Sequence, residues 1–149
     1  MLENTPPSVA LGVVVQENNF MSACHPHFGL TLIAINPRYE ELRSHPVRVL
    51  VDTGSELSWL PAEVLEKIDI KRRRTRVFTM ADGRTMDRDV GYSILESEGF
   101  TTVDEVVFAQ PGDMHLMGVR TLEGFGVMVD PLAHRLVATA TLAVSAHAR

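Results

Sequence analysis

The residues best suited to chemistry form one short stretch, Asp52-Thr53-Gly54-Ser55, which directly follows the apolar segment Val47–Val51. Alternation of apolar and other residues in that segment predicts a strand with one buried face. An ionised carboxylate at the end of a buried strand is costly unless it is hydrogen-bonded, paired or protonated. Neighbouring hydroxyls, and a glycine that lets backbone N–H groups approach, supply such partners. The stretch therefore predicts a buried carboxyl group at Asp52 with local hydrogen-bond donors.

A second group of reactive side chains lies at Cys24-His25-Pro26-His27, with one thiol and two imidazoles in four residues. These types can form part of a metal site or a thiol–imidazole pair. The chain has no second cysteine, and its other histidines lack zinc-motif spacing. We interpret the group as loop residues and expect no metal and no cofactor. Phosphate-binding glycine loops and dinucleotide fingerprints are also absent from the sequence.

Composition favours one globular domain, because 45% of the 149 residues are hydrophobic and 22% are charged. The net charge of −5 argues against nucleic acid or an anionic membrane as a partner. The one dense basic run, 71–74 followed by Arg76, is interpreted as a solvated connection, with a partner-docking patch as the alternative. A single cysteine excludes an intrachain disulfide. No stretch approaches the roughly 20 apolar residues of a membrane span, and no signal-peptide pattern opens the sequence, so we expect a cytoplasmic protein.

Most of the remaining chain is typical of short strands separated by turns. Residues 61–68 predict a helix with Pro61 in its first turn, and residues 121–125 predict a single helical turn. The dipeptide Asp82-Gly83 favours a tight hairpin turn. Strands are expected at 9–15, 28–35, 47–51, 76–80, 85–94, 101–109, 116–118, 127–129 and 136–144. This pattern predicts an all-β sandwich or barrel with few helices.

The strand that ends in Asp52-Thr53-Gly54-Ser55 resembles the active-site loop of the retropepsin-like aspartic proteases. Later features agree with that family in order and spacing: a short helix, a glycine-bearing hairpin at 81–84 where the family has its flap, and Leu116-Met117-Gly118. The resemblance extends over about residues 28–137. It implies an all-β acid-protease half-barrel with one or two short helices, completed by homodimerisation.

The resemblance also implies roles for the loop residues. Asp52 would be the catalytic acid and base, and Thr53 would brace the two loops across the dimer axis. Gly54 would permit the turn and offer its backbone to substrate, and Ser55 would hydrogen-bond the carboxylate. One Asp-Thr-Gly per chain supplies half of a two-carboxylate site, so catalysis is expected to need one Asp from each subunit of a homodimer.

Other residues are expected to bind substrate or support the loop. The flap would close over a bound peptide and comprises Met80, Ala81, Asp82, Gly83 and Arg84. Its Ala-Asp-Gly tip departs from the glycine-rich tip of the viral enzymes, and Trp59 stands where the family usually has a smaller apolar residue. Leu57 and Gly118 would support the active-site loop.

These expectations define an aspartic endopeptidase that hydrolyses a peptide or protein substrate with dyad-activated water. The alternative is a non-catalytic peptide-binding or dimerisation module on the same fold. Residues 1–27 are expected to form an N-terminal extension that is partly disordered or contributes a peripheral strand. Residues 28–149 are expected to form the protease domain.

Overall fold

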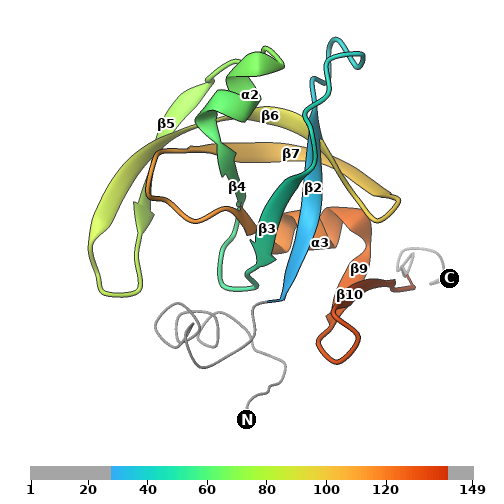
Figure 1. Ribbon diagram of the computed structural model, residues 1–149. Helices are drawn as coiled ribbons and strands as arrows, with labels where there is room; N and C mark the ends of the chain where they lie inside the picture. The colour runs from blue at the N-terminus through green and yellow to red at the C-terminus, as the bar shows by residue number, and fades with distance from the viewer. Residues whose placement is uncertain (1–27, 141–149) are drawn as a thin grey trace, which may run out of the picture.

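The computed structural model describes residues 28–140, which form a strongly curved sheet with two short helices packed against it (Figure 1). The predicted strand at 9–15 and the segment Cys24-His25-Pro26-His27 lie outside the described residues, as do residues 141–144 of the last predicted strand. Within the described part, no helix is long and apolar enough to cross a membrane.

Apart from the strand at Ser58–Pro61, the elements follow one another in the order that the sequence predicts. The strands are β2 (Gly29–Ile35), β3 (Val47–Val51), β4 (Ser58–Pro61), β5 (Arg74–Thr79), β6 (Thr85–Ser97), β7 (Phe100–Ala109), β8 (Leu116–Met117), β9 (Val127–Asp130) and β10 (Arg135–Ala138). The helices are α2 (Ala62–Lys67) and α3 (Val119–Phe125). The predicted all-β class with short helices is therefore confirmed.

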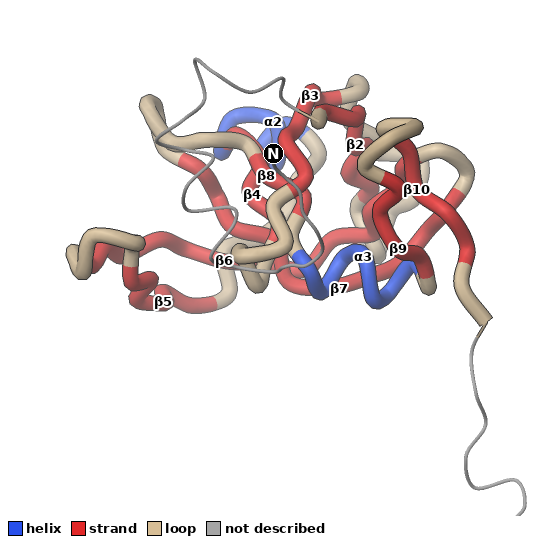
Figure 2. The backbone as a smooth tube through the Cα atoms, turned by 90° about the horizontal axis from the view of Figure 1, so that it is seen from below, coloured by secondary structure: helices blue, strands red, loops and turns tan. Residues whose placement is uncertain are grey.

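The main sheet closes on itself. Its strand order is β2-β3-β8-β4-β7-β6-β5, and β2 also pairs with β6 through Ile33–Glu96 and Ile35–Ile94. Six strands thus form a ring, while β5 extends from β6 as the outer strand of a long hairpin. Figure 2 shows α3 beside β7, with the β9–β10 hairpin on the opposite side of the molecule from β5. Closure removes most free strand edges, which would otherwise invite aggregation.

Two apolar clusters fill the structure. The larger lies inside the ring and includes Leu32, Leu60, Leu65, Leu95 and Phe108, all fully buried. The smaller cluster consists of Leu57, Trp59, Val90, Val107 and Ala109, against which Phe78, Met86 and Leu116 pack. Because this second cluster joins the chain after Asp52 to both strands of the β5–β6 hairpin, it couples the hairpin base to the loop region.

Some element boundaries differ from the predictions. The strand β4 has no alternating pattern, since three of its four residues are buried, and the sequence did not predict it. It pairs in parallel with β7, which only the tertiary fold arranges. The predicted strand at 136–144 ends at Ala138 in the described part, where the Thr139 N–H and hydroxyl both donate to the Gly126 carbonyl.

Candidate active site

Asp52 lies immediately after β3, at the point where the chain turns away from the sheet. Its backbone N–H donates to the Met117 carbonyl at 2.9 Å, and the Val51 N–H donates to the Phe28 carbonyl at 3.0 Å. The parallel pairing of β3 with β8 continues through the Leu50 N–H, which donates to the His115 carbonyl at 3.0 Å. Neighbours on both sides therefore fix the backbone that carries the Asp52 carboxyl group.

Burial controls the chemistry of the Asp52 side chain. The residue is only 5% exposed, and its Oδ1 accepts the Gly54 N–H at 2.8 Å. Loss of hydration raises the pKa of Asp52 from 3.8 to about 6, although the N–H groups of Gly54 and Ser55 act in the lowering direction. A carboxyl group with this pKa exchanges protons readily near neutral pH, as acid–base catalysis requires.

Gly118 lies directly beneath the loop that carries Asp52. A Cβ atom at this position would lie 2.4 Å from the Leu57 carbonyl oxygen and 2.8 Å from the Ser55 carbonyl oxygen. The Gly118 N–H donates to Ser58 Oγ at 2.9 Å, and the next residue, Val119, donates its N–H to the Ser55 carbonyl at 2.8 Å. The structure thus brings the two predicted supporting residues, Leu57 and Gly118, into direct contact.

The loop residues differ in exposure and in their hydrogen bonds. Thr53 and Ser55 are half-buried, whereas Gly54 is exposed at the tip of the turn. The Ser55 hydroxyl donates to the Leu57 carbonyl at 2.7 Å instead of to the carboxylate, where we expected it. A carbonyl two residues further along the same turn is a close local acceptor for a serine hydroxyl. The Gly54 N–H donates to the Asp52 carboxylate at 2.8 Å.

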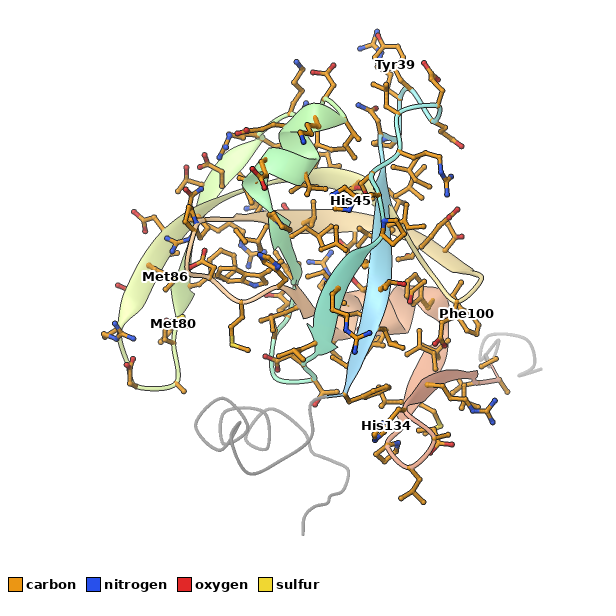
Figure 3. The ribbon with its side chains drawn as sticks, in the orientation of Figure 1. Tyr39, His45, Met80, Met86, Phe100 and His134 are labelled. Atoms are coloured by element: carbon orange, nitrogen blue, oxygen red, sulfur yellow. The ribbon has the colours of Figure 1, made fainter. Side chains whose placement is uncertain are left out.

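The predicted flap is the tip of the β5–β6 hairpin. The Met80 N–H donates to the Arg84 carbonyl at 2.7 Å, and Gly83 has a φ of +89°, the left-handed conformation that glycine adopts easily. Asp82 accepts the Arg84 N–H at 3.0 Å and the Arg84 Nε at 2.6 Å, so the turn is held by its own side chains. Figure 1 shows this tip and the β3–β4 turn at the same lower edge of the molecule, and Figure 3 shows Met80 close to the tip.

An ion-pair network joins the first strand of this hairpin to the loop after Asp52. The buried Glu105 accepts Arg74 Nη2 at 2.7 Å and Arg76 Nη1 at 3.2 Å. Arg76 Nη2 also reaches Glu56 Oε1 at 3.3 Å, and Arg120 Nη1 reaches Glu56 Oε2 at 3.4 Å. The sequence analysis did not predict this network. The available signal was the spacing of Arg74 and Arg76, because residues two apart on a strand share one face.

The second strand of the hairpin has its own connection. Arg88 donates from Nε and Nη2 to the two carboxylate oxygens of Asp113, at 2.7 and 2.8 Å. This two-pronged contact lowers the pKa of Asp113. Asp113 also accepts the Gln110 N–H at 2.7 Å, which orders the loop leading into β8. Each strand of the predicted flap is therefore tied to a segment that holds the Asp52 loop.

Replacing Glu105 by Ala should cost about 1–3 kcal/mol of stability, because it removes the acceptor shared by two arginines in a mostly buried position. Urea unfolding measures this loss. The matched control is Glu96→Ala, which removes a more exposed pair with Arg43 and should cost at most about 1 kcal/mol. Equal small losses of stability in both variants would show that the network does not stabilise the fold.

Among residues 28–140, no three or more His, Cys, Asp and Glu side chains lie close enough together to hold a metal ion. Cys24-His25-Pro26-His27 lies outside these residues. The described residues at the site supply a buried carboxyl group, backbone N–H donors and hydroxyls.

A closed β-sheet that buries the Asp of an Asp-Thr-Gly loop, with a glycine element beneath it, is the architecture of the retropepsin-like class. Residues 41–124 match the family model described as gag-polyprotein putative aspartyl protease. The match covers more than half of the chain, and the protein belongs to this family. The matched residues include the Asp52 loop, the β5–β6 hairpin and Gly118. A comparison with curated proteins gave no match.

Proposed function

We propose that the protein is an aspartic endopeptidase in which Asp52 activates water for attack on a peptide bond. The observation that carries this proposal is the buried Asp52 carboxyl group, whose pKa is raised to about 6, in the Asp-Thr-Gly loop of an aspartyl protease family member. A carboxyl group that serves only to cap a turn gains nothing from such burial. An acid–base group does gain, because burial brings its pKa toward the working pH.

Catalysis takes place in a homodimer, with one Asp52 from each copy facing the other across a two-fold axis. The sequence holds one Asp-Thr-Gly, whereas the water-activating chemistry of this class needs two carboxyl groups that share a proton. The exposed Gly54 and the half-buried Thr53 are available for contact with a second copy. In the dimer the two titration steps belong to the carboxyl pair and not to either residue alone.

In the reaction, the ionised Asp52 takes a proton from water while the water oxygen bonds to the carbonyl carbon of the substrate. The protonated Asp52 of the second copy gives its proton to the carbonyl oxygen, and the C=O double bond becomes a single bond. The tetrahedral diol then collapses as its nitrogen receives a proton from the first carboxyl group, the ionised carboxylate of the second copy takes a proton from one diol hydroxyl, and the C–N bond breaks. The products are a carboxylic acid and an amine, and the dyad regains one shared proton.

The hairpin tip, Met80 to Arg84, closes over an extended peptide and adds strand-like contacts. Its base packs against Leu57 and Trp59 through Phe78 and Met86. These apolar residues support a preference for apolar substrate side chains next to the scissile bond. The ion pairs of Arg76 and Arg88 support a fixed hairpin base, so that only the tip moves when substrate enters.

The test is turnover of a peptide library, read by mass spectrometry, with and without a peptide analogue that carries a non-cleavable tetrahedral centre. We expect cleavage that the analogue blocks and that chelation and thiol alkylation leave unchanged. Peptides that bind without cleavage would instead favour a non-catalytic peptide-binding module. Cleavage that chelation or alkylation abolishes would point to Cys24 and its neighbouring histidines.

A further inference from the structure

A hollow of about 260 Å³ lies between the loop after β2 and the segment after α2. It is lined by Asn36, Pro37, Arg38, Tyr39, Asp69, Ile70, Lys71, Arg73 and Tyr92. Figure 3 shows Tyr39 at the upper end of the molecule and Met80 of the flap at the lower end. The hollow is thus remote from the candidate active site, and the proposed function does not use it.

Asn36 fixes the two walls of this hollow relative to each other. Its buried side-chain Nδ2 donates to the carbonyls of Ile68 at 2.8 Å and Asp69 at 3.1 Å, on one wall. Its Oδ1 accepts the N–H groups of Arg38 at 2.8 Å and Tyr39 at 3.0 Å, on the other. Both donors and both lone pairs of the amide are therefore used in joining the walls, and the hollow is preformed.

The basic run 71–76 is mostly neutralised by ion pairs, and Arg73 is its exception. Within residues 28–140, no carboxylate lies within ion-pair distance of Arg73 or of Arg38, which faces it across the hollow. The other cations of the run have acidic partners: Lys71 with Asp69, Arg72 with Glu66 and Asp89, Arg74 with Glu105, and Arg76 with Glu56 and Glu105.

Both tyrosines of the chain line this hollow. The Arg38 guanidinium lies 5.5 Å from the ring centroid of Tyr39, and the Arg73 guanidinium lies 5.5 Å from that of Tyr92. The two tyrosines are 43% and 48% exposed. Each arginine thus lies against an aromatic ring, with no acidic side chain of residues 28–140 at ion-pair distance.

A second hollow, of about 390 Å³, includes residues of the same β2–β3 loop but has the opposite charge balance. Its charged lining residues are Glu40, Arg43 and Glu96, and Arg43 pairs with Glu96 at 2.9 Å. Two carboxylates against one cation disfavour an anion there. The first hollow has three cations against the single carboxylate of Asp69, in a chain whose net charge is −5.

We propose that the hollow between Arg38 and Arg73 binds a phosphate group, either free or carried on a small monoester. Guanidinium groups match phosphate oxygens in a two-pronged geometry, and Arg is favoured over Lys for this recognition. The Tyr39 and Tyr92 hydroxyls are further donors for an oxyanion. The volume accommodates a phosphate group together with a small organic substituent.

The test follows the two tyrosine rings by NMR on isotope-labelled protein during titration with inorganic phosphate or O-phosphoserine, against chloride at matched ionic strength. We expect both rings to shift saturably with phosphate ligands and not with chloride. Saturation by inorganic phosphate assigns the site to the free ion as well, and saturation by O-phosphoserine alone assigns it to the ester.

The double variant Arg38→Gln/Arg73→Gln should weaken binding by at least about tenfold, and each single variant should weaken it less. The matched control Arg43→Gln removes a cation from the second hollow and should leave binding unchanged. Circular dichroism checks that the variants are folded. Shifts that fail to saturate, that chloride reproduces, or that survive in the folded double variant would overturn the proposal.

Discussion

Replacing Asp52 by Asn is expected to abolish peptide cleavage while the fold is retained. The amide has nearly the shape of the carboxyl group and still accepts the Gly54 N–H that now reaches Oδ1, but it cannot take a proton from water. Loss of an acid–base group of this kind lowers the rate by about a thousandfold or more. Steady-state cleavage of a peptide identified in the library screen measures the effect.

The matched control is Asp130→Asn, at the β9–β10 turn. Asp130 accepts the N–H groups of Leu132 and Ala133, and Asn is equally suited to this turn geometry, so cleavage should be unchanged. A folded Asp52→Asn protein that keeps wild-type cleavage would contradict the role of this residue.

The same variant should also change how stability depends on pH. The folded-state pKa of Asp52, about 6, lies above the ordinary value of 3.8, so the folded protein holds this proton more tightly than the unfolded chain. The resulting stabilisation is complete below about pH 4 and is lost as the pH rises through about 6. Above that pH the buried carboxylate is ionised, and the free energy of unfolding is about 3 kcal/mol lower than below pH 4. Asn has no such cost.

Urea unfolding at pH 4 and pH 8, at a protein concentration where only monomer sediments, measures this difference for the single carboxyl group. We compare the free energies of unfolding of Asp52→Asn and the wild type. The variant's value minus the wild-type value should be larger at pH 8 than at pH 4 by about 3 kcal/mol. Parallel pH profiles for the two proteins would mean that the Asp52 carboxyl group titrates normally in the folded chain.

Gly118→Ala is expected to have the largest effect on the structure of the loop. The added Cβ would lie 2.4 Å from the Leu57 carbonyl oxygen and 2.5 Å from its carbonyl carbon. These are backbone atoms that cannot rotate away, so the loop or the α3 segment must shift. We expect a loss of about 3 kcal/mol or more in stability, together with loss of cleavage as the Asp52 loop is displaced.

The matched control for this substitution is Gly29→Ala on β2. A Cβ atom there meets the end of the flexible Arg48 side chain, which can move, so the loss should be much smaller. Thermal unfolding and cleavage assays on both variants measure the contrast. Equal behaviour would show that the close approach at Gly118 is not a constraint on the loop.

Local signals in the sequence account for much of the fold. The alternation before Asp52 predicts β3, and Asp82-Gly83 predicts the hairpin turn that the structure contains. The helix predicted at 61–68 corresponds to α2. These elements are predictable because their determinants, periodicity and turn chemistry, lie within a few residues of one another.

The features that sequence reasoning missed depend on partners far apart in the chain. Ring closure pairs β2 with β6, and Arg74 and Glu105 are 31 residues apart. The basic run is exposed at residues 71–75, as interpreted, but the sequence did not predict that carboxylates from α2, β6, β7 and the loop after Asp52 pair with most of its members. Pairwise charge contacts leave no periodic signal, so only the fold reveals them.

The most direct test of the account is the rate of peptide cleavage per mole of protein, measured over a range of concentrations alongside sedimentation analysis. If Asp52 acts only when paired with its counterpart in a second copy, the rate per mole will rise with concentration in proportion to the dimer fraction. Excess Asp52→Asn protein will then suppress the wild type by forming mixed dimers. A rate per mole that stays constant at concentrations where only monomer sediments would contradict the account.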